Sequence, residues 1–352
     1  MTSVLATSAV RGVRSCRQRG RSVLATLVVL ALLAVVAALA FAWYQYQRPL
    51  AMKGERIEVR IPAGASTRTI ARLLQDAGLV VDAPSFLAAV KATDAARNLR
   101  AGRYEFTRGV SLQDIVAKLR AGDVLRERLT IVEGWTFREM RAELARNPDL
   151  RQDSAKLDAA ALLKAIGATE SRPEGLFAPD TYVFDPGSSD LDVLRQAYRA
   201  QAARLQKAWA ARAADLPLKS PYEALILASI VEKETGQGGE RARIAGVFIN
   251  RLKKGMLLQT DPTVIYGLGD KFDGNLRKRD LTADGPYNTY TRVGLPPTPI
   301  ALPGAAALEA TLKPASSDDL YFVARGDGTS EFSATLDAHN RAVNKYQLKG
   351  GR

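Results

Sequence analysis

The sequence predicts an α+β protein with an N-terminal transmembrane helix, a small α+β subdomain and then a larger mixed α+β domain. Three observations support this prediction. An uncharged apolar stretch lies near the N-terminus, a strand–glycine–helix pattern then repeats, and longer helical patterns alternate with short strand-like runs in the rest of the chain. A length of 352 residues is enough for an anchor and two modest domains.

The first element is a membrane anchor. Residues 22–47 contain no charged side chain, and their apolar centre, residues 23–46, is long enough to cross a bilayer as a helix. Residues 1–22 form a basic tail that we expect to stay in the cytoplasm, with residues 1–20 disordered. Residues 47–54 form a short linker to the remaining chain, which we expect outside the cytoplasm. A cleaved signal peptide is the alternative, but the apolar stretch is too long for one.

Composition excludes several kinds of chemistry. Cys16 is the only cysteine and His339 the only histidine, so neither an intrachain disulfide nor a histidine-rich metal site can form. A Ser-His-Asp triad would depend on His339 and is a poor fit. The net charge of +13 does not indicate nucleic acid as a partner, because the predicted topology puts most of the chain outside the cytoplasm. An acidic envelope polymer or an anionic lipid surface fits this charge better.

Residues 55–148 contain three copies of one local pattern. In each copy an apolar strand end is followed by Gly, then by a Ser or Thr, and then by apolar residues at helical spacing. The three glycines are Gly64, Gly109 and Gly134. The pattern predicts strand, turn, N-cap and amphipathic helix, and we expect the strands to form one small sheet covered by helices. These strands are residues 56–61, 102–106 and 128–132. The first copy resembles a LysM module, a small sugar-binding fold, which implies a LysM-like subdomain.

We expect residues 149–348 to form the mixed α+β domain. Its expected elements are a polar helical connector at 150–172, a turn-rich run at 173–184, helices at 190–213, 220–236 and 240–253, a proline-rich loop at 285–299, a hairpin at 320–335 and a last helix carrying His339. Proline leaves the backbone little freedom, so the loop suits the rigid wall of a cleft. A loop that only tethers two parts of the chain is the alternative.

The helix expected at 220–236 has clear start and stop signals. Ser220 is a suitable N-cap, and Pro221 suits the first helical position. Glu223 would complete a capping box with Ser220, and Gly236 is a natural stop just past the end.

One face of this helix combines apolar side chains with a carboxylate. Glu234 recurs at helical spacing with Leu227, Ile230 and Val231. A buried carboxylate is costly unless it is paired or protonated, and a carboxyl protonated near neutral pH can act as a general acid. We therefore expect the pKa of Glu234 to lie above about 4.3, the usual value for Glu. Glu232 is the alternative acid, and an ordinary surface role at a helix end is the alternative for both.

Four runs make the chain recognisable. They are LASIVEKET at 227–235, VFINRL at 247–252, LQTDPTVIYG at 258–267 and YNTY at 287–290. In this order they resemble the endolytic murein transglycosylases of the MltG, or YceG-like, family. The run at 173–184 and the final hairpin are similar to that family as well, so the resemblance covers nearly everything after the anchor.

The resemblance implies the activity and its location. The family cleaves the bond between N-acetylmuramic acid and N-acetylglucosamine inside peptidoglycan strands, leaves a 1,6-anhydro ring and thereby sets strand length. It implies a single-pass anchor in the cytoplasmic (inner) membrane, a catalytic domain in the periplasm, and no metal or organic cofactor. Peptidoglycan is the implied substrate, and peptidoglycan synthases are the implied partners.

The resemblance also implies site residues. Glu234 matches the family's catalytic Glu, with Glu232 as the fallback, and Tyr290 matches a further active-site residue. Weaker candidates for lining the substrate groove are Gln259, Asp261 and Asn288. For these three, a turn cap or a buried hydrogen bond is the alternative.

Two other functions stay open at this point. A muramidase that hydrolyses the same bond needs a second carboxylate, for which Glu174, Asp180 or Asp261 could serve. A non-catalytic scaffold that binds the wall and recruits synthases would need no acid.

Overall fold

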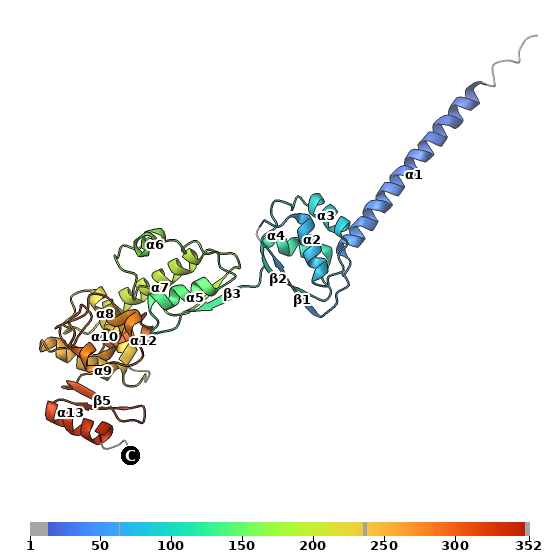
Figure 1. Ribbon diagram of the computed structural model, residues 1–352. Helices are drawn as coiled ribbons and strands as arrows, with labels where there is room; N and C mark the ends of the chain where they lie inside the picture. The colour runs from blue at the N-terminus through green and yellow to red at the C-terminus, as the bar shows by residue number, and fades with distance from the viewer. Residues whose placement is uncertain (1–12, 63, 235–237, 349–352) are drawn as a thin grey trace, which may run out of the picture. The chain divides into compact units, whose positions relative to one another are not determined.

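The computed structural model describes residues 13–62, 64–234 and 238–348 (Figure 1). The chain divides into two compact units, Met1–Leu125 and Arg126–Arg352, which we call the N-terminal and the C-terminal unit. Both units combine helices with two-stranded antiparallel sheets, so the predicted α+β class is confirmed. The division falls after Leu125, whereas the sequence pattern suggested one after residue 148.

Helix α1 (Val13–Gln47) contains the candidate membrane anchor. Its segment Ala25–Gln47 is long and apolar enough to cross a membrane, and its apolar side chains are exposed. This segment overlaps the predicted span at 23–46. The expectation of disorder up to residue 20 is wrong for residues 13–20, because the helix continues through this basic flank, where Arg and Gln are good helix formers. Residues 1–12 lie outside the described residues.

The predicted linker at 47–54 is folded into the N-terminal unit. The Leu50 N–H donates to the Val110 carbonyl at 2.9 Å, and the Val80 N–H donates to the Ala51 carbonyl at 2.9 Å. The segment therefore does not act as a free tether between the anchor and the first strand.

After α1, the described part of the N-terminal unit consists of one antiparallel strand pair and three helices. Strands β1 (Arg56–Ile61) and β2 (Gly102–Thr107) pair with Ile57 opposite Phe106. Exposed and buried residues alternate along β1, which is typical of a sheet with one face on a core. The helices are α2 (Thr67–Asp76), α3 (Ala83–Ala92) and α4 (Leu112–Ala121). The predicted cap of α4 is present, since Ser111 forms a capping box with Asp114.

The third copy of the repeat lies in the C-terminal unit, so the predicted three-stranded sheet is wrong. Strand β3 (Glu127–Thr130) pairs with β4 (Thr181–Phe184) and not with β1 or β2. The local signals are right, because Thr136 caps α5 (Phe137–Arg146) through a capping box. A local pattern sets strand and helix, but the choice of partner strand depends on packing between distant residues.

The C-terminal unit is built mainly from helices. Besides α5, its described helices are α6 (Ala159–Ile166), α7 (Asp190–Ala210), α8 (Pro221–Glu234), α9 (Arg241–Lys253), α10 (Asp261–Leu268), η1 (Gly269–Lys271), α11 (Lys278–Thr282), α12 (Ala305–Leu312), α13 (Leu336–Val343) and η2 (Asn344–Leu348). The predicted hairpin is present as β5 (Tyr321–Ala324) and β6 (Ser330–Ser333).

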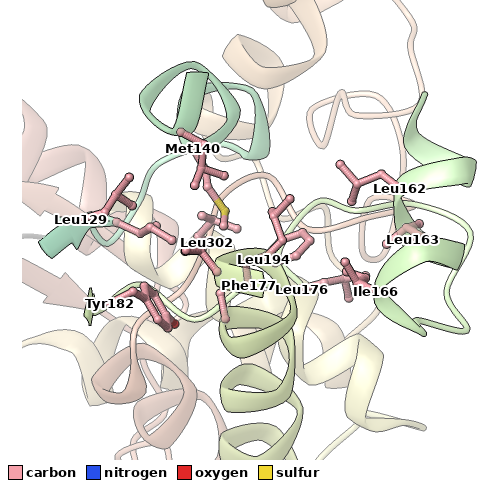
Figure 2. Packing of buried hydrophobic residues seen from close by; sticks show 14 of the residues in the cluster. Leu129, Met140, Leu162, Leu163, Ile166, Leu176, Phe177, Tyr182, Leu194 and Leu302 are labelled. Carbon is pink, nitrogen blue, oxygen red and sulfur yellow. The ribbon is translucent and has the colours of Figure 1, made fainter. Parts of the chain in front are cut away.

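Two apolar clusters hold this unit together. The first joins β3, α5 and α7, with Leu129, Met140, Phe177 and Leu194 pointing toward one another (Figure 2). The second packs α8 against α9 and α12 around Ile230. Helix α8 contributes side chains to both clusters. Helix α8 therefore runs through the interior of the unit.

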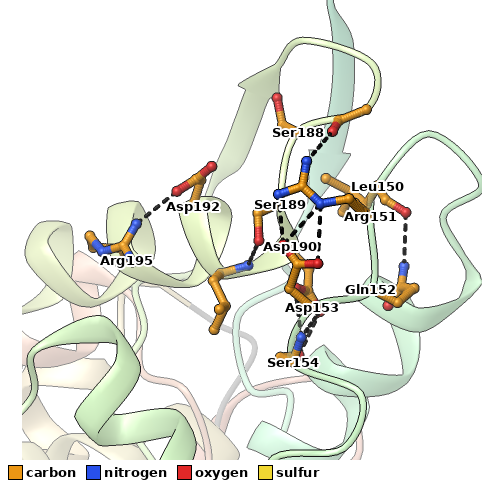
Figure 3. A network of polar contacts seen from close by, with 12 residues as sticks. Leu150, Arg151, Gln152, Asp153, Ser154, Ser188, Ser189, Asp190, Asp192 and Arg195 are labelled. Carbon is orange, nitrogen blue, oxygen red and sulfur yellow. Dashed lines mark hydrogen bonds and ion pairs between the residues drawn. The ribbon is translucent and has the colours of Figure 1, made fainter. Parts of the chain in front are cut away.

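A polar network ties the predicted connector to the start of α7 (Figure 3). Asp190 is 1% exposed and accepts hydrogen bonds from the N–H of Ser154 at 3.0 Å and from its Oγ at 2.5 Å. Arg151 binds Asp153 through two guanidinium nitrogens. The buried carboxylate is satisfied by these donors, so the connector is fixed to the core of the unit.

Candidate active site

Helix α8 is enclosed on all sides along most of its length. Residues 224–231 are buried, where the sequence predicted a single apolar stripe. Ser220 Oγ accepts a hydrogen bond from the Glu223 N–H at 3.2 Å, as an N-cap does. The Glu223 carboxylate accepts from the N–H of Lys219 at 2.6 Å, one residue before the donor that a capping box uses. Residues 235–236, which include Thr235 of the motif and the predicted glycine stop, lie outside the described residues.

Glu234 closes the described part of α8, and its side chain is half-buried. The Thr260 hydroxyl donates a hydrogen bond from Oγ1 to Oε1 of Glu234. Burial raises the pKa of Glu234, the bond from Thr260 opposes this, the charge of Asp261 adds to it, and Arg251 opposes it. The net upward direction agrees with the sequence prediction. A carboxyl of this kind keeps its proton to higher pH than an exposed one, as a general acid must.

Three buried threonines lie where the start of α10 meets the proline-rich loop, beside Glu234. They are Thr260, Thr263 and Thr289. The Thr260 N–H donates to Thr289 Oγ1 at 3.1 Å, and Thr263 Oγ1 donates to the Thr260 carbonyl at 2.8 Å. The Gln259 N–H donates to the Thr289 carbonyl at 3.1 Å. Gln259 itself is exposed and has a φ of 50°, a strained value for a residue with a side chain. The backbone that carries the Thr260 hydroxyl is thus held by Thr289 and by Thr263 of α10.

Asp261 and Tyr290 form a hydrogen-bonded pair near Glu234. The Tyr290 hydroxyl donates to Asp261 Oδ1 at 2.5 Å. Burial, this hydrogen bond and the nearby charges of Asp261 and Glu234 raise the pKa of Tyr290. The phenol therefore stays protonated and acts as a donor, while the exposed carboxylate of Asp261 adds negative charge near Glu234.

Asn288 holds the backbone of Tyr290 through a hydrogen bond. Its side chain is 5% exposed, and its amide nitrogen donates to the carbonyls of Ala283 at 2.7 Å and Leu281 at 3.0 Å. Its Oδ1 accepts from the N–H of Tyr290 at 2.9 Å. These bonds occupy both ends of the amide, so Asn288 holds the backbone of its own loop, and its role in lining the substrate groove stays a prediction.

Arg251 of α9 supports the loop that carries Thr260. It is 8% exposed and donates to the carbonyls of Leu258 at 2.8 Å and Leu320 at 2.7 Å, and its guanidinium lies 5.1 Å from the ring centroid of Tyr321. Its positive charge opposes the upward shift in the pKa of Glu234. A single buried cation thus connects α9, the final hairpin and the candidate acid.

Thr260, Thr289 and Arg251 are residues of this site that the sequence patterns did not distinguish. A signal existed for Arg251, which follows Val247 by four residues and Phe248 by three and so shares the apolar face of α9. An arginine on such a face must find hydrogen-bond partners inside the protein. No local pattern distinguishes the two threonines from ordinary turn residues.

The side chain of Glu232 is buried, and its carboxylate is bound by two groups of the protein. Its side chain is 5% exposed, and it accepts from Arg241 Nη2 at 3.3 Å and from the Gly304 N–H at 2.8 Å. Gly304 is the N-cap of α12, so the carboxylate lies at a helix N-terminus, where negative charge is favourable. Both oxygens are engaged, and burial raises the pKa of Glu232 as well, so the choice of Glu234 as the acid stays a prediction.

Comparison with known proteins places the chain in a family. A model of the YceG-like family matches residues 59–345, which is most of the chain and includes every residue described in this site. The chain belongs to the YceG-like family. The resemblance inferred from the four motifs is therefore confirmed.

Individual relatives of the family agree. The chain is 33% identical to an endolytic murein transglycosylase of Bacillus subtilis over 82% of this chain and 84% of that protein. It is 30% identical to an endolytic murein transglycosylase of Streptococcus pneumoniae over 82% of this chain and 58% of that protein. A crystal structure of a yceG-like protein from Listeria monocytogenes is 34% identical, with a TM-score of 0.53 over 82% of this chain and 98% of that one.

The second carboxylate of a hydrolase finds little support in this YceG-like protein. Glu174 is 7% exposed, and both of its oxygens accept hydrogen bonds, from the Phe137 N–H and the Tyr266 hydroxyl. Asp180 is engaged with Arg204. Of the three carboxylates considered, Asp261 is the one whose charge raises the pKa of Glu234. Within residues 13–62, 64–234 and 238–348, no group of three or more His, Cys, Asp or Glu side chains could hold a metal ion.

Proposed function

We propose that this YceG-like protein is an endolytic murein transglycosylase. It is a lyase that cleaves the bond between N-acetylmuramic acid and N-acetylglucosamine within peptidoglycan strands, leaves 1,6-anhydro-muramic ends and so ends strand elongation. The observation that carries the proposal is the environment of Glu234, which is half-buried, hydrogen-bonded by Thr260 and raised in pKa. Both relatives are named endolytic murein transglycosylases, which supports the same reaction.

One carboxyl performs both proton transfers. Glu234 gives its proton to the glycosidic oxygen as the bond to C1 of the muramic residue breaks and an oxocarbenium-like centre forms. The resulting carboxylate takes the proton of the same sugar's 6-hydroxyl, whose oxygen closes onto C1. The proton lost in the first step is regained in the second, and no water is consumed. An intramolecular hydroxyl has a high effective concentration, so it can replace the water that a hydrolase must position.

Thr260 suits both states of this carboxyl. Its hydroxyl binds Oε1, and among the residues that the structure describes Oε2 has no hydrogen-bond partner, so Oε2 is the oxygen that we place toward the substrate. The same bond stabilises the carboxylate formed after the first proton transfer, because a donated hydrogen bond favours the ionised form.

Asp261 and Tyr290 stabilise charge. The negative carboxylate of Asp261 favours the positive oxocarbenium-like centre, and the Tyr290 hydroxyl fixes its orientation at 2.5 Å. Gln259, the remaining predicted groove residue, is exposed on the strained turn beside them. Its Oε1 accepts a hydrogen bond from Arg251 Nη1 at 3.4 Å, so its amide nitrogen is the end that would contact substrate.

The anchor sets where the enzyme lies in the cell, and the N-terminal unit contacts glycan. Segment Ala25–Gln47 crosses the cytoplasmic membrane once, the arginine-rich flank stays in the cytoplasm, and the C-terminal unit faces the wall in the periplasm. The strand–glycine–helix unit at 56–121 acts as a LysM-like glycan contact, and peptidoglycan synthases are the proposed partners.

Product analysis tests the proposal. Purified peptidoglycan is incubated with the full chain in detergent, and the released fragments are identified by mass spectrometry. Anhydro ends from the wild type, absent with Glu234→Gln and present with the exposed control Glu309→Gln, support a lytic transglycosylase. Reducing ends would instead identify a muramidase, and cleavage that survives in Glu234→Gln would remove Glu234 from the mechanism.

A further inference from the structure

Glu174 is a buried carboxyl that the proposed mechanism does not use. It lies in the turn between α6 and β4 and is 7% exposed. Its Oε1 accepts from the N–H of Phe137 at 2.9 Å, and its Oε2 accepts from the hydroxyl of Tyr266 at 3.0 Å. Phe137 is the first residue of α5, and Tyr266 belongs to α10. One carboxylate thus joins the start of one helix to the side of another.

The contact continues into the proline-rich loop. The Tyr266 ring packs edge-on against the ring of Tyr287, with centroids 4.9 Å apart, and the Tyr287 hydroxyl lies 2.8 Å from Thr298 Oγ1. A Cβ on Gly267 would come within 3.0 Å of the Tyr287 Cβ, so α10 and the loop are in tight contact. The position of Tyr266 therefore sets where α10 lies against this loop.

Helix α10 is also the element that holds the candidate acid. It begins at Asp261, and its N-cap is Thr260, whose hydroxyl binds Glu234. Tyr266 stands five residues from Asp261 on a single short helix, about 7.5 Å along its axis. Because a helix moves as a rigid element over this length, a shift at Tyr266 moves Thr260 and Asp261 as well.

We propose that Glu174 is a positioning residue for the active site, acting through the Tyr266 hydroxyl to hold α10 so that Thr260 and Asp261 stay beside Glu234. It touches neither substrate nor reacting atoms. The inference rests on the proposed function for its kinetic consequences, but its structural part, the fixing of α10 by Glu174, can be measured without activity.

The surroundings give this contact a pH dependence. Burial raises the pKa of Glu174 to about 7, the hydrogen bonds from Phe137 and Tyr266 oppose the shift, and the charge of Glu139 on α5 adds to it. Tyr222 of α8 also faces Glu174, and the pKa values of both tyrosines are raised, so they stay neutral. Phe137 and Tyr266 both donate hydrogens to Glu174, which suits the ionised form of its carboxyl. Protonation as pH falls through about 7 weakens the hold on α10.

The test uses full-length Glu174→Gln, Tyr266→Phe and the double variant. The matched control is Glu170→Gln, which removes another carboxylate–tyrosine bond, to Tyr198 at 2.9 Å on α7. We expect kcat to fall about 10-fold or more in each single variant, with KM within about 2-fold, since a small misplacement of catalytic groups is costly. In Glu174→Gln the single amide oxygen accepts from the Phe137 N–H, which can only donate, so the amide nitrogen faces Tyr266 and the hydrogen bond donated by Tyr266 is lost. The double variant should then be no worse than the singles, because both changes remove the bond that Tyr266 donates. Glu174→Gln should also lose the acidic limb of the pH–rate profile near 7, which a change in stability alone would not remove.

Hydrogen exchange provides the readout that does not need catalysis. Peptides covering residues 258–268 should exchange faster in Glu174→Gln and Tyr266→Phe than in the wild type or Glu170→Gln. Unchanged exchange there, a wild-type kcat in Tyr266→Phe, or additive losses in the double variant would overturn the inference. If Glu174→Gln does not fold, Tyr266→Phe, which deletes one oxygen atom, decides alone. A wild type that leaves no anhydro ends would refute the proposed function, while the exchange comparison would still decide the role of Glu174.

Discussion

Thr260 donates its hydroxyl hydrogen to Oε1 of Glu234, and its own backbone N–H is held by Thr289. The bond joins the end of the buried helix α8 to the start of α10. It opposes the rise in the pKa of Glu234 that burial causes. The acid is therefore balanced between two effects, one favouring the protonated form needed to break the bond and one favouring the carboxylate needed afterwards.

Replacing Thr260 by Val removes this bond while keeping the shape of the side chain. The pKa of Glu234 should rise further, because the effect that lowered it is gone, and the alkaline limb of the pH–rate profile should move to higher pH. A hydrogen bond to a charged group is worth about 1.5–3 kcal/mol, so kcat should fall about 10-fold or more. The exposed Thr282→Val is the control. An alkaline limb that stays at its wild-type pH would contradict this role of Thr260.

Replacing Tyr290 by Phe tests the pair with Asp261. The carboxylate loses its 2.5 Å hydrogen bond and with it a fixed orientation toward the developing positive charge. We expect kcat to fall about 10- to 100-fold from the loss of a charge-assisted bond. Steady-state rates on purified glycan strands measure this, with Tyr346→Phe as the control for removing a tyrosine hydroxyl elsewhere in the C-terminal unit. A wild-type kcat in Tyr290→Phe would leave the pair without a catalytic role.

The sequence predicted the parts of the site that depend on local order. The spacing of Glu234 with Ile230 and Val231 indicated an acid in apolar surroundings, and the upward direction of its pKa agrees. Its catalytic role remains a prediction. Glu232 could not be separated from Glu234 by pattern, because its partner Gly304 lies 72 positions further along the chain.

The parts that the sequence could not predict depend on distant contacts. Thr260 and Thr289 meet across 29 positions through two irregular loops, where no periodicity exists to read. Strand β3 had the correct local signals but an incorrect predicted partner, because β4 competes with β1 and β2 through packing that only the folded chain defines.

Glu232 should matter for stability more than for catalysis. In Glu232→Ala the Gly304 N–H and the Arg241 guanidinium lose their buried partner, and breaking such a contact costs about 3–5 kcal/mol. Urea denaturation of the full chain in detergent should show this loss. Glu232→Gln, which can still accept from Gly304, should keep most of the cleavage activity. If Glu232→Gln instead abolished cleavage and left stability unchanged, the assignment of the acid would move to Glu232.

Glu234→Gln should make the folded protein more stable at neutral pH while it removes cleavage. The folded-state pKa of Glu234 is raised above its unfolded value, so the folded state favours the protonated carboxyl. The stabilisation from this proton is fully present below the unfolded pKa of about 4.3 and is lost as pH rises through the folded pKa. Gln has no proton to lose, so the variant should gain on the wild type as pH increases. Melting temperatures of both proteins measured from pH 4 to 8 test this, with Glu309→Gln expected to follow the wild type. A gap that stays constant over this range would show that Glu234 does not titrate in the buried environment described.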